Sequence, residues 1–79
     1  MVKVVLPELG EGIRSAVVSY WHREAGDSVN EGDDLVEMAT DKATFNVPSP
    51  ATGTVAKVCF EEGNTANVGD TLAEIEEES

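Results

Sequence analysis

The sequence predicts an all-β fold, in which two four-stranded antiparallel sheets form a flattened barrel or sandwich with an internal pseudo-twofold axis. Three observations carry this prediction. The chain contains an internal repeat, its glycines and Gly-Asp pairs divide short runs rich in valine and threonine, and no window keeps the period of a helix. Because neither half alone could cover an apolar sheet face, the two halves are expected to pack on each other.

The repeat appears when the chain is shifted by 37 residues, which places "VSYWHREAGDSVNEGDDLVEM" over "VAKVCFEEGNTANVGDTLAEI". Eight positions are then identical, and four of them hold turn-forming Gly, Asn or Asp. The identical pairs are Val18/Val55, Glu24/Glu61, Gly26/Gly63, Asn30/Asn67, Gly32/Gly69, Asp33/Asp70, Leu35/Leu72 and Glu37/Glu74. Further back, "VVLP" aligns with "FNVP" if the first half holds about four extra residues within "ELGEGI".

Eight short strands follow from the positions of the turn residues. They are expected at roughly 3–7, 16–23, 28–30, 35–40, 43–48, 54–60, 65–67 and 71–76. One domain is expected over residues 1–79, and the acidic end at 76–79 is expected to begin a linker.

The register of the central hairpin can be tested against its hydrophobic pattern. If Asp41 and Lys42 are the two turn residues, opposite positions sum to 83. One face then pairs Met38 with Phe45 and Val36 with Val47, and the other pairs Ala39 with Thr44 and Glu37 with Asn46. This register separates apolar from polar side chains, as a half-buried hairpin requires, and a slip by one residue would not.

Charge and composition limit the partners. Five basic and sixteen acidic residues give a net charge of −11, which opposes binding to nucleic acid or to anionic membranes. The chain has no apolar run of membrane-spanning length and no signal-peptide pattern at its start. A single cysteine excludes an internal disulfide and fits a reducing compartment. We therefore expect a soluble, monomeric domain, cytoplasmic or in the mitochondrial matrix after processing, with the cytoplasm favoured.

Lys42 is the unusual residue of the hairpin. Hairpin tips favour glycine or asparagine, yet this one has a lysine, and the segment from Glu24 to Ala56 contains seven acids and no other base. The repeat places Ser79 at the equivalent position, so the hairpin and the chain ends are expected at opposite poles. An ordinary exposed lysine is the simplest reading of such a residue, and these three features argue against it.

These motifs resemble the lipoyl domain of 2-oxo acid dehydrogenase acyltransferases. The resemblance lies in the "TDKA" turn, the preceding "LVEM", the following "PSPATG", the opening "LPELGEG" and the Gly-Asp turn of each half, and it covers essentially the whole chain. It implies that Lys42 carries lipoic acid in amide linkage, with Asp41 and Ala43 as recognition neighbours. The domain would then be a non-catalytic carrier, a piece of a dihydrolipoyl acyltransferase.

The resemblance also implies a set of partners. The lipoyl arm would serve a 2-oxo acid decarboxylase, the acyltransferase catalytic domain and dihydrolipoyl dehydrogenase, and a lipoate ligase or lipoyl transferase would attach it. The opening motif favours the pyruvate or branched-chain complexes over the 2-oxoglutarate complex. One segment of the first half has no counterpart in the second half: Glu8, Leu9, Gly10, Glu11, Gly12 and Ile13. It follows the first strand, which the repeat makes equivalent to the strand leaving Lys42. The segment is therefore expected to lie near Lys42 and to help the decarboxylase recognise the domain.

Three alternatives remain. A biotinyl carrier domain has a similar fold, but its family places methionine on both sides of the lysine, where this chain has Asp41 and Ala43. The lipoyl carrier of glycine cleavage is similar in principle but longer. An unmodified β interaction module is the third.

Other residues point more weakly to function. His22 and Cys59 occupy equivalent repeat positions but lack the partners that a metal site or a nucleophile needs. Tyr20 and Trp21 are expected to be partly buried sheet residues, and "GEG" lacks the lysine and helix of a phosphate-binding loop.

Overall fold

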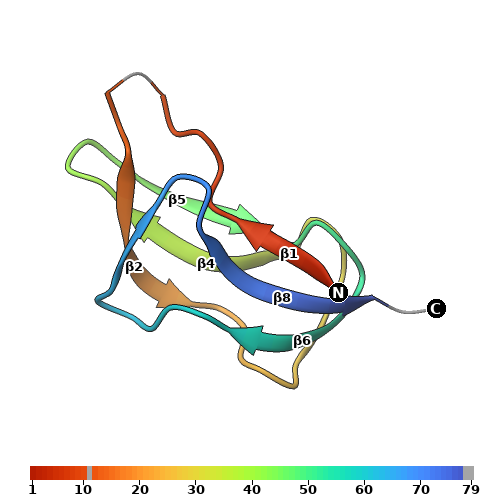
Figure 1. Ribbon diagram of the computed structural model, residues 1–79. Helices are drawn as coiled ribbons and strands as arrows, with labels where there is room; N and C mark the ends of the chain where they lie inside the picture. The colour runs from red at the N-terminus through yellow and green to blue at the C-terminus, as the bar shows by residue number, and fades with distance from the viewer. Residues whose placement is uncertain (11, 78–79) are drawn as a thin grey trace.

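The structure consists of two four-stranded antiparallel sheets that face each other (Figure 1). A computed structural model describes residues 1–10 and 12–77. The strands are β1 (Val2–Val5), β2 (Ser15–Trp21), β3 (Ser28–Val29), β4 (Asp34–Ala39), β5 (Thr44–Pro48), β6 (Gly53–Val58), β7 (Thr65–Asn67) and β8 (Thr71–Glu77). All eight predicted strands are present, with ends within two residues of those predicted.

The sheets have the strand orders β1-β8-β6-β3 and β5-β4-β2-β7, and neither closes on the other. The predicted fold of two four-stranded antiparallel sheets is therefore confirmed, and the two sheets do not close into one continuous barrel. Each sheet contains strands from both halves of the chain, since β7 joins the sheet of β2 and β4 while β3 joins that of β6 and β8. Neither half could form its sheet alone.

Equivalent backbone hydrogen bonds join the two halves of the repeat. The backbone N–H of Gly26 donates to the carbonyl of Val55 at 2.7 Å, and that of Gly63 donates to the carbonyl of Val18 at 2.7 Å. Gly63 lies 37 positions after Gly26, and Val55 lies 37 positions after Val18, so the two hydrogen bonds are equivalent in the repeat. The pseudo-twofold relation expected from the sequence is thus confirmed by the pairing of the two halves.

The predicted alignment of the first strand is wrong by two residues. Lys3 pairs with Glu74, whereas Asn46 pairs with the equivalent Glu37, so Lys3 corresponds to Asn46 and Val4 to Val47. Val4 lies 14 positions before Val18, while Val47 lies eight before Val55. The first half therefore has six extra residues instead of about four. The prolines in "VVLP" and "FNVP" suggested the wrong offset because they are not equivalent: Pro48 is paired with Asp34 in β5, whereas Pro7 lies beyond the end of β1.

The core is supplied mainly by the central strands of the two sheets. β4 and β8 each lie between two neighbours and contribute equivalent residues with no exposed surface, namely Leu35, Val36 and Met38 from β4 and Leu72, Ala73 and Ile75 from β8. Burying a leucine or isoleucine side chain stabilises a fold by about 1.5–3 kcal/mol. The buried side chains of β4, packed in the same core as those of β8, therefore anchor the β4–β5 hairpin to the body of the domain.

At its end the chain differs slightly from the prediction. β8 continues through Glu77, which pairs with Gly53, so Glu76 and Glu77 belong to a strand. An expected linker would start after them, at residues that lie outside those described. None of the described residues belongs to an apolar helix long enough to cross a membrane.

Asp33 and Asp70 close equivalent turns. The carboxylate Oδ2 of Asp33 accepts a hydrogen bond from the backbone N–H of Asn30 at 2.9 Å, and Oδ2 of Asp70 accepts one from Asn67 at 2.9 Å. The glycine before each aspartate has a positive φ, 92° at Gly32 and 93° at Gly69, a conformation that other residues rarely adopt. The Gly-Asp pair is thus a turn signal in both halves, as predicted.

Replacing either aspartate by alanine should lower the free energy of unfolding by about 0.5–2 kcal/mol, because a backbone N–H loses its partner. Urea denaturation of Asp33→Ala and Asp70→Ala measures this. Asp34→Ala, which alters an exposed neighbour in β4, should stay within about 0.5 kcal/mol of the parent. Two aspartate variants as stable as this control would show that the carboxylate bonds contribute nothing.

Candidate functional site

The β4–β5 hairpin has the register expected from its sequence pattern. Met38 pairs with Phe45, Val36 with Val47, Ala39 with Thr44 and Glu37 with Asn46. Met38, Val36 and Val47 are buried against the core, whereas Thr44 and Asn46 are exposed. The two faces therefore differ as predicted, and Asp41 and Lys42 form the tip.

The tip does not need the glycine conformation that its position suggested. Neither Asp41 nor Lys42 has a positive φ, so the turn is neither of the two mirror-image types that favour Asn-Gly. With negative φ at both residues the strand ends splay, and only one backbone bond closes the turn, from Thr40 N–H to the Ala43 carbonyl at 2.8 Å. Lysine is thus compatible with this backbone, and the expectation that this tip position favours glycine or asparagine is wrong.

Thr40 takes the place of the missing backbone bond. Its hydroxyl oxygen accepts hydrogen bonds from the backbone N–H groups of Lys42 at 3.2 Å and Ala43 at 3.1 Å, and the hydroxyl donates to the Ala43 carbonyl at 3.0 Å. The sequence pointed to Thr40 only as part of a motif. Its role could have been expected because Ser and Thr hydroxyls bond the backbone two residues ahead in such turns.

Removing this hydroxyl should loosen the hairpin tip. Thr40→Val keeps the side-chain shape but leaves the Lys42 and Ala43 N–H groups without their acceptor, so we expect a loss of about 1 kcal/mol in the free energy of unfolding. Faster amide hydrogen exchange at these two residues should accompany it. Thr40→Ser, which restores the hydroxyl, should recover most of both effects. Equal exchange in all three proteins would contradict this role.

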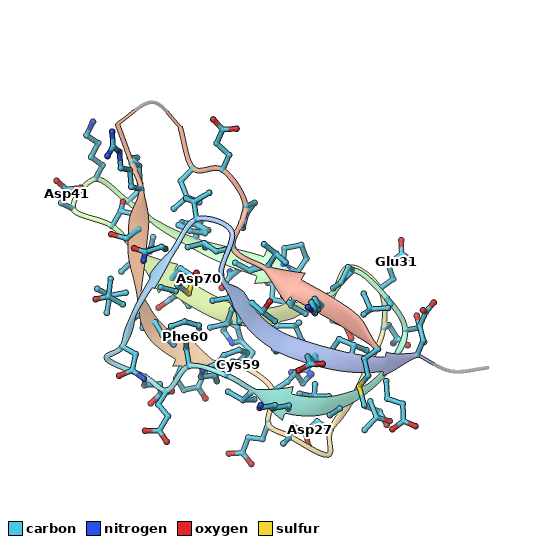
Figure 2. All side chains as sticks on the ribbon, in the orientation of Figure 1. Asp27, Glu31, Asp41, Cys59, Phe60 and Asp70 are labelled. Carbon is cyan, nitrogen blue, oxygen red and sulfur yellow. The ribbon has the colours of Figure 1, made fainter. Side chains whose placement is uncertain are left out.

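Asp41, Lys42 and Ala43 are all exposed, and the hairpin tip is far from the N-terminus (Figures 1 and 2). Figure 2 labels Asp41 at one end of the molecule, whereas β1 begins near the other. The predicted separation of the tip from the N-terminus is confirmed, and Ser79 lies outside the described residues. Lys42 therefore projects from a rigid two-stranded base into solvent.

The loop between β1 and β2 lies beside this tip. A groove of about 370 Å³ is lined by Pro7, Glu8, Leu9 and Ile13 from the loop and by Thr40, Lys42, Ala43 and Phe45 from the hairpin. The expected proximity of the extra segment to Lys42 is thus confirmed.

The glycines of this loop have a different place. Gly10 and Gly12, with φ of 120° and 82°, line a neighbouring hollow with Arg14 and Val68. The N–H of Ile13 donates to the carbonyl of Gly10 at 3.3 Å, which closes a turn in the loop. Glu11, also predicted for partner recognition, lies outside the described residues. The groove beside Lys42 is therefore lined by the two ends of the segment, Glu8 and Leu9 at one end and Ile13 at the other.

The other residues that the sequence singled out lie away from the hairpin tip or on the sheet surface, and the structure assigns them no chemistry. Trp21 is half-buried and its Nε1 donates to the carbonyl of Phe60 at 2.7 Å, as expected for a sheet residue. Tyr20 is 54% exposed, so its predicted partial burial is wrong. Its ring packs edge-on against the ring of His22, with 5.2 Å between the ring centroids. Cys59 is exposed and free, and among the described residues no three His, Cys, Asp or Glu side chains gather as a metal site.

Comparison with known proteins agrees with this geometry. The dihydrolipoyllysine-residue acetyltransferase component of the pyruvate dehydrogenase complex from Staphylococcus aureus is 44% identical over 71 residues, which are 90% of this chain and 16% of that protein. The solution structure of the lipoyl domain of the 2-oxoglutarate dehydrogenase complex from Azotobacter vinelandii superimposes with a TM-score of 0.81 at 28% identity and covers all of both chains.

A multi-domain long-chain acyl-CoA carboxylase shares the fold alone, with a TM-score of 0.69 at 22% identity over 84% of this chain and 7% of that one. The residues matched in the Staphylococcus aureus acetyltransferase are 16% of that protein, so the chain spans about a sixth of the length of the acetyltransferases that it matches. The model of the Biotin_lipoyl family, described as "Biotin-requiring enzyme", matches residues 2–75. With its repeated sandwich and its lysine at the hairpin tip, this chain belongs to the Biotin_lipoyl family.

Proposed function

We propose that this domain is a lipoyl carrier and that Lys42 is the residue to which lipoic acid is attached. The position of Lys42 carries the proposal, because it is the exposed tip of a hairpin whose base is locked by the core and by Thr40. The similarity to an acetyltransferase named for its dihydrolipoyllysine residue and to a solved lipoyl domain supports it. Asp41 and Ala43 are exposed on either side and form the immediate surface that an attaching enzyme would meet.

The residues present fit such a group. Attachment forms an amide with the amine of Lys42 and removes its positive charge, which takes the domain from −11 to −12. The amine lies on an exposed residue, so modification requires no rearrangement of the core. When bound, the lipoyl group supplies a dithiolane that accepts and releases acyl groups and electrons. The protein holds the arm away from its own sheets, and tethering raises the effective concentration of the group at each enzyme it visits.

The resemblance to lipoyl domains of 2-oxo acid dehydrogenase acyltransferases also suggests which enzymes this arm would visit. They are a 2-oxo acid decarboxylase, the acyltransferase catalytic domain and dihydrolipoyl dehydrogenase. The carrier itself would be non-catalytic. The Staphylococcus relative belongs to a pyruvate dehydrogenase complex, and this similarity favours pyruvate as the substrate of the decarboxylase.

Intact mass spectrometry tests the proposal. The domain is incubated with lipoate, ATP and a lipoate ligase, and peptide mapping should place a single lipoyl adduct on Lys42. Parallel incubation with biotin and a biotin ligase should leave the mass unchanged, since the methionines of biotinyl domains are replaced by Asp41 and Ala43. A biotin adduct would assign the biotinyl function instead, and no adduct in either reaction would favour an unmodified interaction module.

The loop beside Lys42 should help the decarboxylase to recognise the domain. Deleting six residues within 7–14, to match the second half of the repeat, removes the wall of the groove but leaves the strands intact. We expect the rate of reductive acylation to fall about tenfold or more, because the partner loses its contacts with this wall. Melting temperature and lipoylation by the ligase should change little and serve as controls. Unchanged acylation kinetics would exclude a role for the loop.

A further inference from the structure

The outer faces of the two sheets differ although the repeat makes them equivalent in backbone. We call the outer face of the β5-β4-β2-β7 sheet the hairpin face and that of the other sheet the opposite face. On the hairpin face, Glu37 is paired on its two sides with Tyr20 and Asn46. On the opposite face, the equivalent Glu74 is paired with Lys57 and Lys3. The equivalent glutamates are thus flanked by two cations on the opposite face and by two neutral side chains on the hairpin face.

The difference continues toward the hairpin tip. Ala39 on the hairpin face corresponds to Glu76 on the opposite face, and Val17 beside it corresponds to Thr54. Val17 is 40% exposed. Val17, Tyr20 and Ala39 are uncharged and at least partly exposed, whereas two of their three equivalents on the opposite face, Lys57 and Glu76, are charged.

This neutral face is continuous with the tip that carries Lys42. A hollow of about 330 Å³ is lined by Ser15, Ala16 and Val17 of β2 and by Ala39, Thr40 and Asp41 of the hairpin. Ala39 precedes Asp41 by two residues, so it lies within roughly 7 Å of the tip along the strand. Any protein that grips the tip closely therefore also meets Ala39 and Val17.

The length of the lysine side chain decides which enzyme must come this close. An unmodified lysine reaches only about 6 Å from its backbone, whereas the lipoyl group adds on the order of ten further bonds. Enzymes that use the completed arm can keep their active sites at a distance from the hairpin, even where they contact the loop beside it. The enzyme that attaches the group has to bring its active site to the bare amine, and its surface must therefore contact the residues next to the tip.

We infer that the hairpin face is the docking surface of the enzyme that attaches lipoate to Lys42. This inference rests on the function proposed above. The activated donor is an acyl phosphate anhydride such as lipoyl adenylate, and an enzyme that holds its phosphate has basic groups around the active site. Asp41 and Glu37 complement such groups, and the absence of Lys3 and Lys57 equivalents on this face avoids repulsion.

The transfer balances without a further reactant. The deprotonated Nζ of Lys42 attacks the lipoyl carbonyl, the new C–N bond forms, and the bond between the carbonyl carbon and the phosphate oxygen breaks. Adenylate leaves with that electron pair, and one proton is released from the amine to solvent or to the enzyme. The hairpin face takes no part in these bonds, so its residues are positioning residues for the encounter.

The repeat supplies a matched pair of variants. The double variant Tyr20→Lys with Ala39→Glu grafts onto the hairpin face the residues found at equivalent positions of the opposite face and keeps the net charge at −11. The control, Lys57→Tyr with Glu76→Ala, makes the reverse exchange on the opposite face. Initial rates of lipoylation by the ligase, followed by intact mass over a range of domain concentrations, separate KM from kcat.

We expect the graft to lower kcat/KM about tenfold, mainly through KM, because Tyr20→Lys brings a cation against the basic groups of the enzyme and Ala39→Glu fills the hollow beside the tip. The control should stay within about twofold of the parent. If the graft melts well below the parent, Tyr20→Lys alone, at an exposed position, should still lower kcat/KM about threefold. Equal rates for graft and parent, or equal losses in graft and control, would overturn the inference and leave the proposed function intact. A parent domain that gains no lipoyl group would remove the proposed function and this inference together.

Discussion

Lys42→Gln is expected to fold like the parent and to accept no lipoyl group. Lys42 is exposed and its side chain makes no contribution to the turn, which is held by the Thr40 hydroxyl and by backbone groups. The substitution therefore removes the amine without disturbing the hairpin. Intact mass after exhaustive incubation with lipoate, ATP and ligase should show the unmodified chain alone, and near-identical melting curves should confirm the fold. A lipoyl adduct elsewhere in the variant would mean that the ligase reads exposure alone.

Exchanging the two tip residues tests whether position within the turn is recognised. The variant Asp41→Lys with Lys42→Asp keeps the composition, the charge and the pairing of Met38 with Phe45. Both positions accept L-residues without strain, because neither has a positive φ. The amine would nevertheless leave the tip in another direction, so we expect lipoylation to fall about a hundredfold, as misplaced reacting groups do. Lipoylation at the parental rate would show that the ligase does not read this position.

Gly53→Ala is expected to destabilise the protein, because the added methyl group has no room between β6 and β8. A Cβ at Gly53 would lie inside contact distance of the Glu76 carbonyl oxygen and close to the backbone of Glu77. Because the obstructing atoms belong to the backbone of a paired strand, β6 and β8 would have to separate locally. Such overpacking costs about 1–3 kcal/mol, and the rigid neighbours favour the upper end. Urea denaturation measures the difference.

A variant in the same strand controls for composition. Ala56→Ser changes an exposed residue of β6 and should stay within about 0.5 kcal/mol of the parent. Lipoylation of Gly53→Ala at temperatures where it is folded should be normal, since Gly53 lies in the sheet that does not contain the hairpin. If Gly53→Ala were as stable as Ala56→Ser, the close approach of the two strands would not be a constraint.

The sequence alone determined the parts of this protein that depend on local pattern. The alternation of apolar and polar residues specified the register of the β4–β5 hairpin, because a slip by one residue would expose the whole apolar set. Repeated Gly-Asp pairs located the equivalent turns, since a positive φ and a carboxylate acceptor are properties of single residues. These local signals were enough to place Lys42 at the tip.

The tertiary structure decided what depends on contacts between distant residues. The offset of β1 follows from its pairing with β8, about 70 residues away, and the motif "VVLP" contains no information about that partner. Gly53 and its equivalent Ala16 look alike as small residues, and only the structure shows that a side chain at Gly53 would meet the backbone of Glu76 in the paired strand. The groove beside Lys42 exists only where the β1–β2 loop meets the hairpin, and the hairpin face exists only where its strands pair. These contacts join segments that are distant in the chain, so no single segment encodes them.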